Sequence, residues 1–82
     1  MSKRERFGIV SQSVITDPNV SLQAKAIYAI LSTFANKDRL CYPSIGTIAD
    51  LASVSCRTVD RKIRELKKKG CIRREGKQLR LL

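Results

Sequence analysis

The sequence predicts one mainly helical domain with a small β-hairpin at its C-terminal end. Its 82 residues suit a single domain. Apolar residues recur at helical spacing in three capped segments, and two short alternating segments flank a glycine near the end of the chain. Hydrophobic residues make up 43% of the chain and aromatic residues only 5%, so we expect an aliphatic core.

The N-terminal part predicts an arm followed by a domain over residues 7–82. Residues 1–6 carry three bases and one acid, and we expect them to form a flexible basic arm. The segment 7–15 (FGIVSQSVI) is rich in β-branched residues, which predicts a short strand or an extended arm on the core. It ends at Asp17-Pro18, because a residue before proline avoids the helical region.

The first predicted helix begins after Ser21, which is expected to be its N-cap, and runs to about Asn36. Tyr28 is expected at the edge of its buried face, with the hydroxyl outward. Residues 36–39 then predict a polar turn, and residues 40–43 an extended lead-in. The face expected to be buried comprises Ala26, Ile27, Ile30, Leu31 and Phe34.

Two further helices and a hairpin are expected after this turn. Ser44 is expected to cap a short helix that points Ile45, Ile48, Ala49 and Ala52 inward. Ser55 caps a longer helix that runs to Lys69 and stops at Gly70, since glycine is favoured just past a helix end. The segments 71–74 and 78–81 flank a glycine turn and predict the hairpin.

The short helix, the turn and the following capped helix form a helix-turn-helix pattern. Ala49 is small where the two helices approach closely, Val54 fills the turn, and Val59 packs the second helix onto the first. Ser53 stands where glycine is common, so we expect a strained or differently shaped turn.

The net charge of +10 is concentrated in the last third of the chain. Residues 7–54 carry three bases and three acids, whereas residues 55–82 carry eleven bases and three acids. A charged end on a neutral body favours docking to a polyanion over a merely solvated basic face.

The third helix places its charge opposite its core side. At about 100° per residue, Val59, Ile63 and Leu66 share one side. Arginine can bind guanine through two donors, and the N-terminal residues of such a helix enter the major groove deepest. We therefore expect base contacts from Ser55, Cys56, Arg57, Thr58 and Arg61. We expect phosphate contacts from Lys62, Arg64 and Lys68.

The chain resembles the winged helix-turn-helix domains of bacterial plasmid and phage proteins, including N-terminal domains of replication initiators. The matching stretches are 21–28 (SLQAKAIY), 41–44 (CYPS), 48–49, 54–55, 57–59 (RTV) and the closing Ile63, Leu66, Gly70 and Ile72. The resemblance covers nearly the whole chain from Phe7, and it departs at 51–53, where the family usually has a leucine followed by glycine. It implies a three-helix core with a C-terminal wing, and DNA binding without catalysis.

The resemblance implies that the wing contacts a minor groove or flanking phosphates. The residues concerned are Arg73, Arg74, Lys77 and Arg80. Side chains alternate between the two faces of a strand, so a hairpin with Ile72, Leu79 and Leu81 in the core would also leave these basic side chains exposed, without any contact to DNA. For the arm, contact with a minor groove is the alternative to a disordered end.

We expect a cytoplasmic, double-stranded DNA-binding protein of a mobile element, acting as a transcriptional regulator or as an accessory factor for replication or transfer. A homodimer or a tandem array on DNA is expected, because an isolated module contacts few base pairs. In the alternative, the wing holds DNA while the third helix mediates dimerisation or another protein contact. Burial of unpaired guanidinium groups disfavours that alternative.

Other functions are not expected from this composition. The chain has no histidine to serve as a triad base, no phosphate-cradling glycine loop and no paired carboxylates, so we do not expect an enzyme. Cys41, Cys56 and Cys71 are widely spaced, which predicts reduced thiols and neither a metal site nor a cofactor. No apolar run approaches the roughly 20 residues of a membrane span. Neither a membrane nor a small-molecule ligand is expected as a partner.

Overall fold

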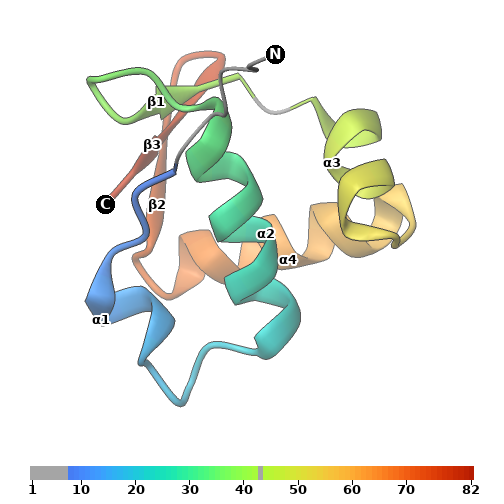
Figure 1. Cartoon of the computed structure of the whole chain (residues 1–82), viewed down its shortest axis with the longest axis horizontal. Helices are drawn as coiled ribbons and strands as arrows, with labels where there is room; N and C mark the ends of the chain where they lie inside the picture. Colours follow the sequence, from blue (N-terminus) through green and yellow to red (C-terminus); the bar gives the residue numbers. More distant parts are fainter. Residues whose placement is uncertain (1–7, 43) are drawn as a thin grey trace, which may run out of the picture.

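A computed structural model of the chain describes residues 8–42 and 44–82, and the expected arm over residues 1–6 lies outside this part. The described part contains four helices and a three-stranded antiparallel sheet. Helices α2, α3 and α4 pack on one another, and the hairpin follows α4 (Figure 1). This is the predicted winged helix-turn-helix fold, with the short helix α1 in addition. The elements in order are α1 (Gln12–Ile15), α2 (Leu22–Phe34), β1 (Leu40–Cys41), α3 (Ile45–Ala52), α4 (Cys56–Lys68), β2 (Ile72–Glu75) and β3 (Gln78–Leu81).

The segment before Asp17 contains a helical turn, so the prediction of a strand or an extended arm is wrong for residues 12–15. The Ser11 carbonyl accepts hydrogen bonds from the amides of Val14 and Ile15, each at 3.1 Å. Val14 is buried in the core cluster. Here the local hydrogen bonds of the turn outweigh the intrinsic strand preference of the β-branched residues.

Helix α2 begins where predicted and ends two residues earlier. The Ser21 hydroxyl oxygen accepts a hydrogen bond from the Ala24 amide at 3.2 Å, and Ala35 leaves the helix in an extended conformation. Ala26 and Phe34 are exposed, so their predicted burial is wrong. The buried face is displaced because α2 contacts α3, α4 and β1 together. The buried positions are Ala24, Ile27, Tyr28, Leu31 and Ser32.

The hydroxyl of Tyr28 points into the domain, contrary to the prediction. It donates a hydrogen bond to the Leu82 carbonyl at 2.9 Å and accepts one from Arg39 Nη2 at 3.0 Å. Arg39 also donates to the Ile9 carbonyl at 2.7 Å. Because these partners satisfy the hydroxyl, the whole tyrosine can be buried, and it is 0% exposed. This Tyr28–Arg39 cluster joins α2 to the segment before α1 and to the end of β3.

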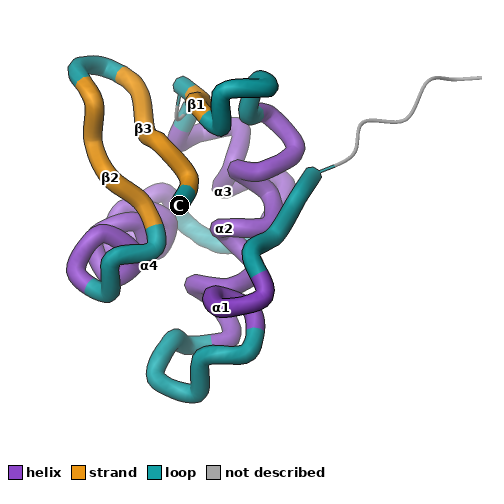
Figure 2. Tube along the Cα trace, turned by 90° about the vertical axis from the view of Figure 1, so that its left-hand side faces the viewer, coloured by secondary structure: helices purple, strands orange, loops and turns teal. Residues whose placement is uncertain are grey.

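The sheet connects the hairpin to the helical core. β3 is the central strand, with β2 on one side and β1 on the other, and Leu40 pairs with Arg80. Residues 40–41, predicted only as an extended lead-in, therefore form a strand. Glu75 pairs with Gln78, which leaves a two-residue turn in which Gly76 has φ +64°. Figure 2 shows β2 starting next to α4 and the hairpin running away from that helix.

The core is aliphatic, as predicted, and it includes the inner side of the wing. Ile72, Leu79 and Leu81 are buried together with apolar residues of α2, α3 and α4. Cys41 and Cys71 are buried thiols, and burial is the main cause that raises the pKa of each. The wing is thus continuous with the helical core at its base.

Candidate nucleic-acid interface

The turn between α3 and α4 determines how the second helix of the motif leaves the first. Ser44 does not cap a backbone amide with its side chain as predicted; its hydroxyl donates instead to Thr47 Oγ1 at 3.1 Å. At the other end of α3, the backbone of Ser53 adopts the left-handed conformation, with φ 59° and ψ 40°. Amide hydrogen bonds from Ser53 to the Asp50 carbonyl and from Val54 to the Ala49 carbonyl close the helix end. A non-glycine residue in this conformation costs about 1 kcal/mol, as expected for a strained turn.

Helix α4 begins at a serine cap that also restrains its first turn. The Ser55 hydroxyl oxygen accepts a hydrogen bond from the Thr58 amide at 3.1 Å, and the two hydroxyl oxygens are 3.0 Å apart. Thr58 is half-buried, whereas Ser55 and Cys56 are exposed. The predicted core side is confirmed, because Val59, Ile63 and Leu66 are all buried.

Four basic side chains follow the outer side of α4, opposite the buried side. All four are exposed, and we refer to them as the α4 basic stripe. Of these four side chains, Arg64 alone has an ion-pair partner among the described residues: its Nη2 lies 3.0 Å from Asp60 Oδ2. The stripe presents a row of cations along the free side of the helix. Its members are Arg57, Arg61, Arg64 and Lys68.

Lys62 lies on another side of α4, against the start of α2. The Glu65 carboxylate there accepts hydrogen bonds from the Ser21 amide at 2.9 Å and the Ser21 hydroxyl at 3.1 Å. The hydrogen bond from the Ser21 backbone amide is the main cause that lowers the pKa of Glu65. Lys62 Nζ lies 3.4 Å from both Glu65 Oε1 and Ser21 Oγ, and its side chain is only 18% exposed. Lys62 therefore does not join the stripe.

The wing begins where Gly70 ends α4. Gly70 has φ +80°, and the Cys71 amide donates to the Leu66 carbonyl at 2.9 Å. The Gly70 amide donates to the Lys67 carbonyl at 3.1 Å, which completes a Schellman motif. The predicted glycine stop is confirmed, and it directs the chain from the helix into β2.

Glu75 holds two of the four basic residues that the sequence predicts for the wing. Arg80 donates from Nε and Nη2 to its carboxylate, and Arg73 Nη2 donates at 3.0 Å. These bonds, chiefly those from Arg80, lower the pKa of Glu75 to about 2 and raise the pKa of Arg80. Arg80 also donates to the Asp38 carbonyl at 3.1 Å, so it ties the wing to the turn before β1. Arg73 keeps 63% of its side chain exposed.

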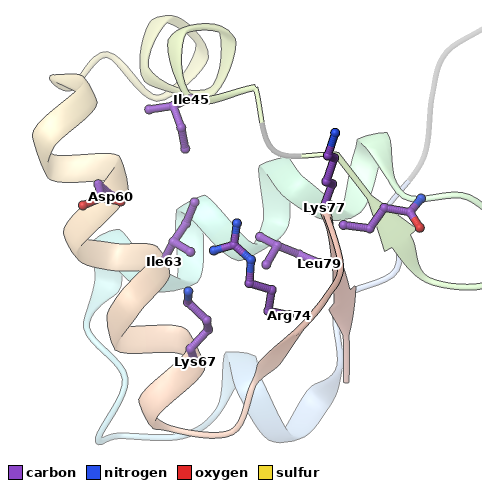
Figure 3. Close-up of a pocket in the computed structure, with 8 residues that line it drawn as sticks. Ile45, Asp60, Ile63, Lys67, Arg74, Lys77 and Leu79 are labelled. Carbon is purple, nitrogen blue, oxygen red and sulfur yellow. The ribbon is translucent and has the colours of Figure 1, made fainter.

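The other two basic residues of the wing, Arg74 and Lys77, line a cleft of about 280 Å³ between the hairpin and α4. Figure 3 shows Arg74 and Lys67 projecting from opposite walls into this space. Lys67 is not among the residues that the sequence predicts for DNA contact, because its role depends on where the wing lies. The cleft is lined by Ile45, Asp60, Ile63, Lys67, Arg74, Lys77, Gln78 and Leu79.

The stripe adjoins the cleft, because Asp60 of the cleft lining contacts Arg64 of the stripe, and we refer to the two together as the basic surface of α4 and the wing. Asp60 is the one acidic residue in the cleft lining among the described residues. The floor of the cleft is apolar, because it is formed by Ile45 of α3, Ile63 of α4 and Leu79 of β3. The charged side chains therefore lie at the rim of the cleft. Such a concave surface with cationic rims is complementary to a polyanionic backbone.

Comparison with known families agrees with this geometry. Residues 19–72 match the model of a family described as a helix-turn-helix domain, and these residues are about two thirds of the chain. The chain belongs to this helix-turn-helix family. The match runs from the start of α2 to the start of β2, and DNA is the partner that membership indicates. Domains of this type are typically not enzymes.

No significant match to a curated protein or to a solved structure was found. None of the helices in the described part of the helix-turn-helix domain is long and apolar enough to cross a lipid bilayer. Within the same residues, no cluster of three or more potential metal-binding side chains occurs.

Proposed function

We propose that this helix-turn-helix domain binds double-stranded DNA by inserting α4 into the major groove while the wing contacts the flanking backbone. The observation that carries the proposal is the α4 basic stripe, which lies opposite the buried side of the helix and adjoins the basic cleft where Arg64 contacts Asp60. A helix of this kind presents its charges to DNA without disturbing its own packing on the core.

Within α4, Arg57 and Arg61 are the principal base-reading residues. Both are exposed in the N-terminal half of the helix, and neither has an ion-pair partner among the described residues. Their guanidinium groups are therefore available for paired hydrogen bonds to guanine. Ser55, Cys56 and Thr58 lie in the first turn of the same helix and contact neighbouring base edges or sugars.

Backbone contacts come from the C-terminal part of the stripe and from the wing. Lys68 extends the stripe, and Arg74 and Lys77 bring charge from the opposite wall of the cleft. Lys67 joins them from α4. Arg73 contributes from the exposed side of the hairpin, whereas Arg80 chiefly supports the wing through Glu75.

We also propose a biological setting for this binding. The resemblance to plasmid and phage proteins supports a cytoplasmic protein of a mobile element, acting in transcriptional regulation or as an accessory factor for replication or transfer. A homodimer or a tandem array on DNA would supply the base pairs that one module cannot contact. The alternative, in which the wing alone holds DNA and α4 contacts a protein, is favoured only by the charge of the cleft.

Substitution of the two cation groups separates these proposals. Duplexes are first selected from random DNA with the wild-type chain, and affinities for selected and random duplexes are then measured by fluorescence anisotropy across salt concentrations. Arg57→Ala and Arg61→Ala are each expected to lower the preference for selected DNA by about 5- to 150-fold. Arg74→Ala and Lys77→Ala are expected to weaken both duplexes alike and to reduce the salt slope by about 1 each.

Lys37→Ala provides the matched control, since it removes one exposed cation from the turn between α2 and β1. It is expected to leave the preference unchanged. If the two α4 variants bind selected DNA as the wild type does while the two wing variants lose binding, the wing-led alternative is correct. If the wild type enriches no sequence, specific recognition by α4 is wrong.

A further inference from the structure

Asp60 is unusual because it places a negative charge on a surface that is otherwise basic. It lies on α4 and lines the cleft together with Lys67, Arg74 and Lys77. A carboxylate in this place repels DNA phosphates and therefore opposes simple electrostatic docking. Its position calls for a contribution other than general attraction to DNA.

The other two acids of α4 and the wing stabilise the fold. Glu65 is 23% exposed and binds Ser21 at the start of α2, and Glu75 is 33% exposed and holds Arg80 on the sheet. Asp60 is 53% exposed, and its partner Arg64 is 73% exposed. The Asp60–Arg64 pair thus connects no two elements of the free domain, and both of its side chains are largely exposed.

The pair restricts the position of one guanidinium group. Asp60 Oδ2 lies 3.0 Å from Arg64 Nη2, one helical turn apart. A guanidinium group carries five N–H donors in a rigid plane, and this contact leaves most of them unused. An unrestrained arginine reaches whichever phosphate is nearest, whereas a restrained one offers its remaining donors in a fixed direction, as paired contact with guanine requires.

We infer that Asp60 is a specificity-determining residue that positions Arg64 to read a base, with guanine as the chemical class that its free donors fit. This inference rests on the proposed insertion of α4 into the major groove. It reassigns Arg64 from the phosphate contact that the sequence predicts to a base contact. Asp60 also disfavours DNA that is held only by its phosphates, because its carboxylate remains on the contact surface.

The test compares Asp60→Ala with Asp50→Ala, which removes the other exposed aspartate of the helix-turn-helix helices and lies outside the cleft lining. Affinities are measured for the duplex selected by the wild type and for a random duplex. Asp60→Ala is expected to bind the random duplex more tightly and the selected duplex more weakly, so that their ratio falls by about 10-fold. Asp50→Ala is expected to leave the ratio unchanged.

Reselection of random DNA with Asp60→Ala and with Arg64→Ala gives a second readout. Both variants are expected to lose the same guanine position, and the double variant is expected to lose nothing further, because the two residues act as one unit. If Asp60→Ala strengthens both duplexes equally and retains every selected position, the inference is overturned and the proposed function stands. If the wild type itself selects no sequence, both are overturned.

Discussion

Removal of the Tyr28 hydroxyl by Tyr28→Phe is expected to destabilise the domain by about 2 kcal/mol. The substitution keeps the ring, which is 0% exposed, and deletes one oxygen atom. That oxygen donates to the Leu82 carbonyl and accepts from Arg39 Nη2. The change therefore isolates the two hydrogen bonds of the Tyr28–Arg39 cluster from the apolar packing around them.

The magnitude follows from these two bonds. A neutral hydrogen bond contributes about 1 kcal/mol to stability, and one to a charged group about 1.5–3 kcal/mol. The sum is reduced because Arg39 keeps its 2.7 Å bond to the Ile9 carbonyl, and because water can reach Leu82, which is 46% exposed. For a domain of this size, about 2 kcal/mol corresponds to a fall in Tm of roughly 8–16 °C.

Urea unfolding followed by circular dichroism measures this loss directly. Tyr42→Phe is the matched control, because Tyr42 is 69% exposed and the same atom is removed from a hydrated position. We expect the control to change the free energy of unfolding by less than about 0.5 kcal/mol. If Tyr28→Phe also changes it by less than that, the cluster does not stabilise the domain and the reasoning is refuted.

Two further predictions concern acid and thiol chemistry. Glu75 has a native pKa of about 2, below the unfolded value of roughly 4.3, so its ion pairs stabilise the domain above about pH 5 and are lost as the pH falls toward 2. Glu75→Gln should therefore lower the urea midpoint at pH 6 and lower it much less at pH 2; an equal reduction at both values would contradict the assignment. Among the thiols, exposed Cys56 should react with a maleimide in the folded protein, whereas buried Cys41 and Cys71 should react only in urea. Selected duplex DNA should slow the labelling of Cys56, and a rate unaffected by saturating DNA would place the N-terminal turn of α4 outside the groove.

Features determined by neighbouring residues could be predicted from the sequence. The caps at Ser21 and Ser55 and the stop at Gly70 depend on side chains and backbone conformations within a few residues, and the structure confirms all three. The buried side of α4 follows from its periodicity alone. Strong local signals thus sufficed to place the helix-turn-helix motif and the hairpin.

Features determined by distant parts of the chain could not be predicted. The burial of Tyr28 depends on Arg39 and Leu82, which no helical phase reveals. Lys62 is not part of the basic surface, because it lies against Glu65 and against Ser21 at the start of α2. Lys67 is part of that surface because the wing lies beside α4. Each of these outcomes depends on the tertiary arrangement rather than on residue type.

The central place of β3 also has a consequence for how the chain folds during synthesis. Leu40 pairs with Arg80, so β1 finds its partner only after about forty further residues have been made. Helices α2, α3 and α4 are complete at Lys68 and contact one another, so they can associate before that point, but the sheet cannot close. A nascent chain therefore carries the complete helix-turn-helix motif before its final strand completes the folded domain.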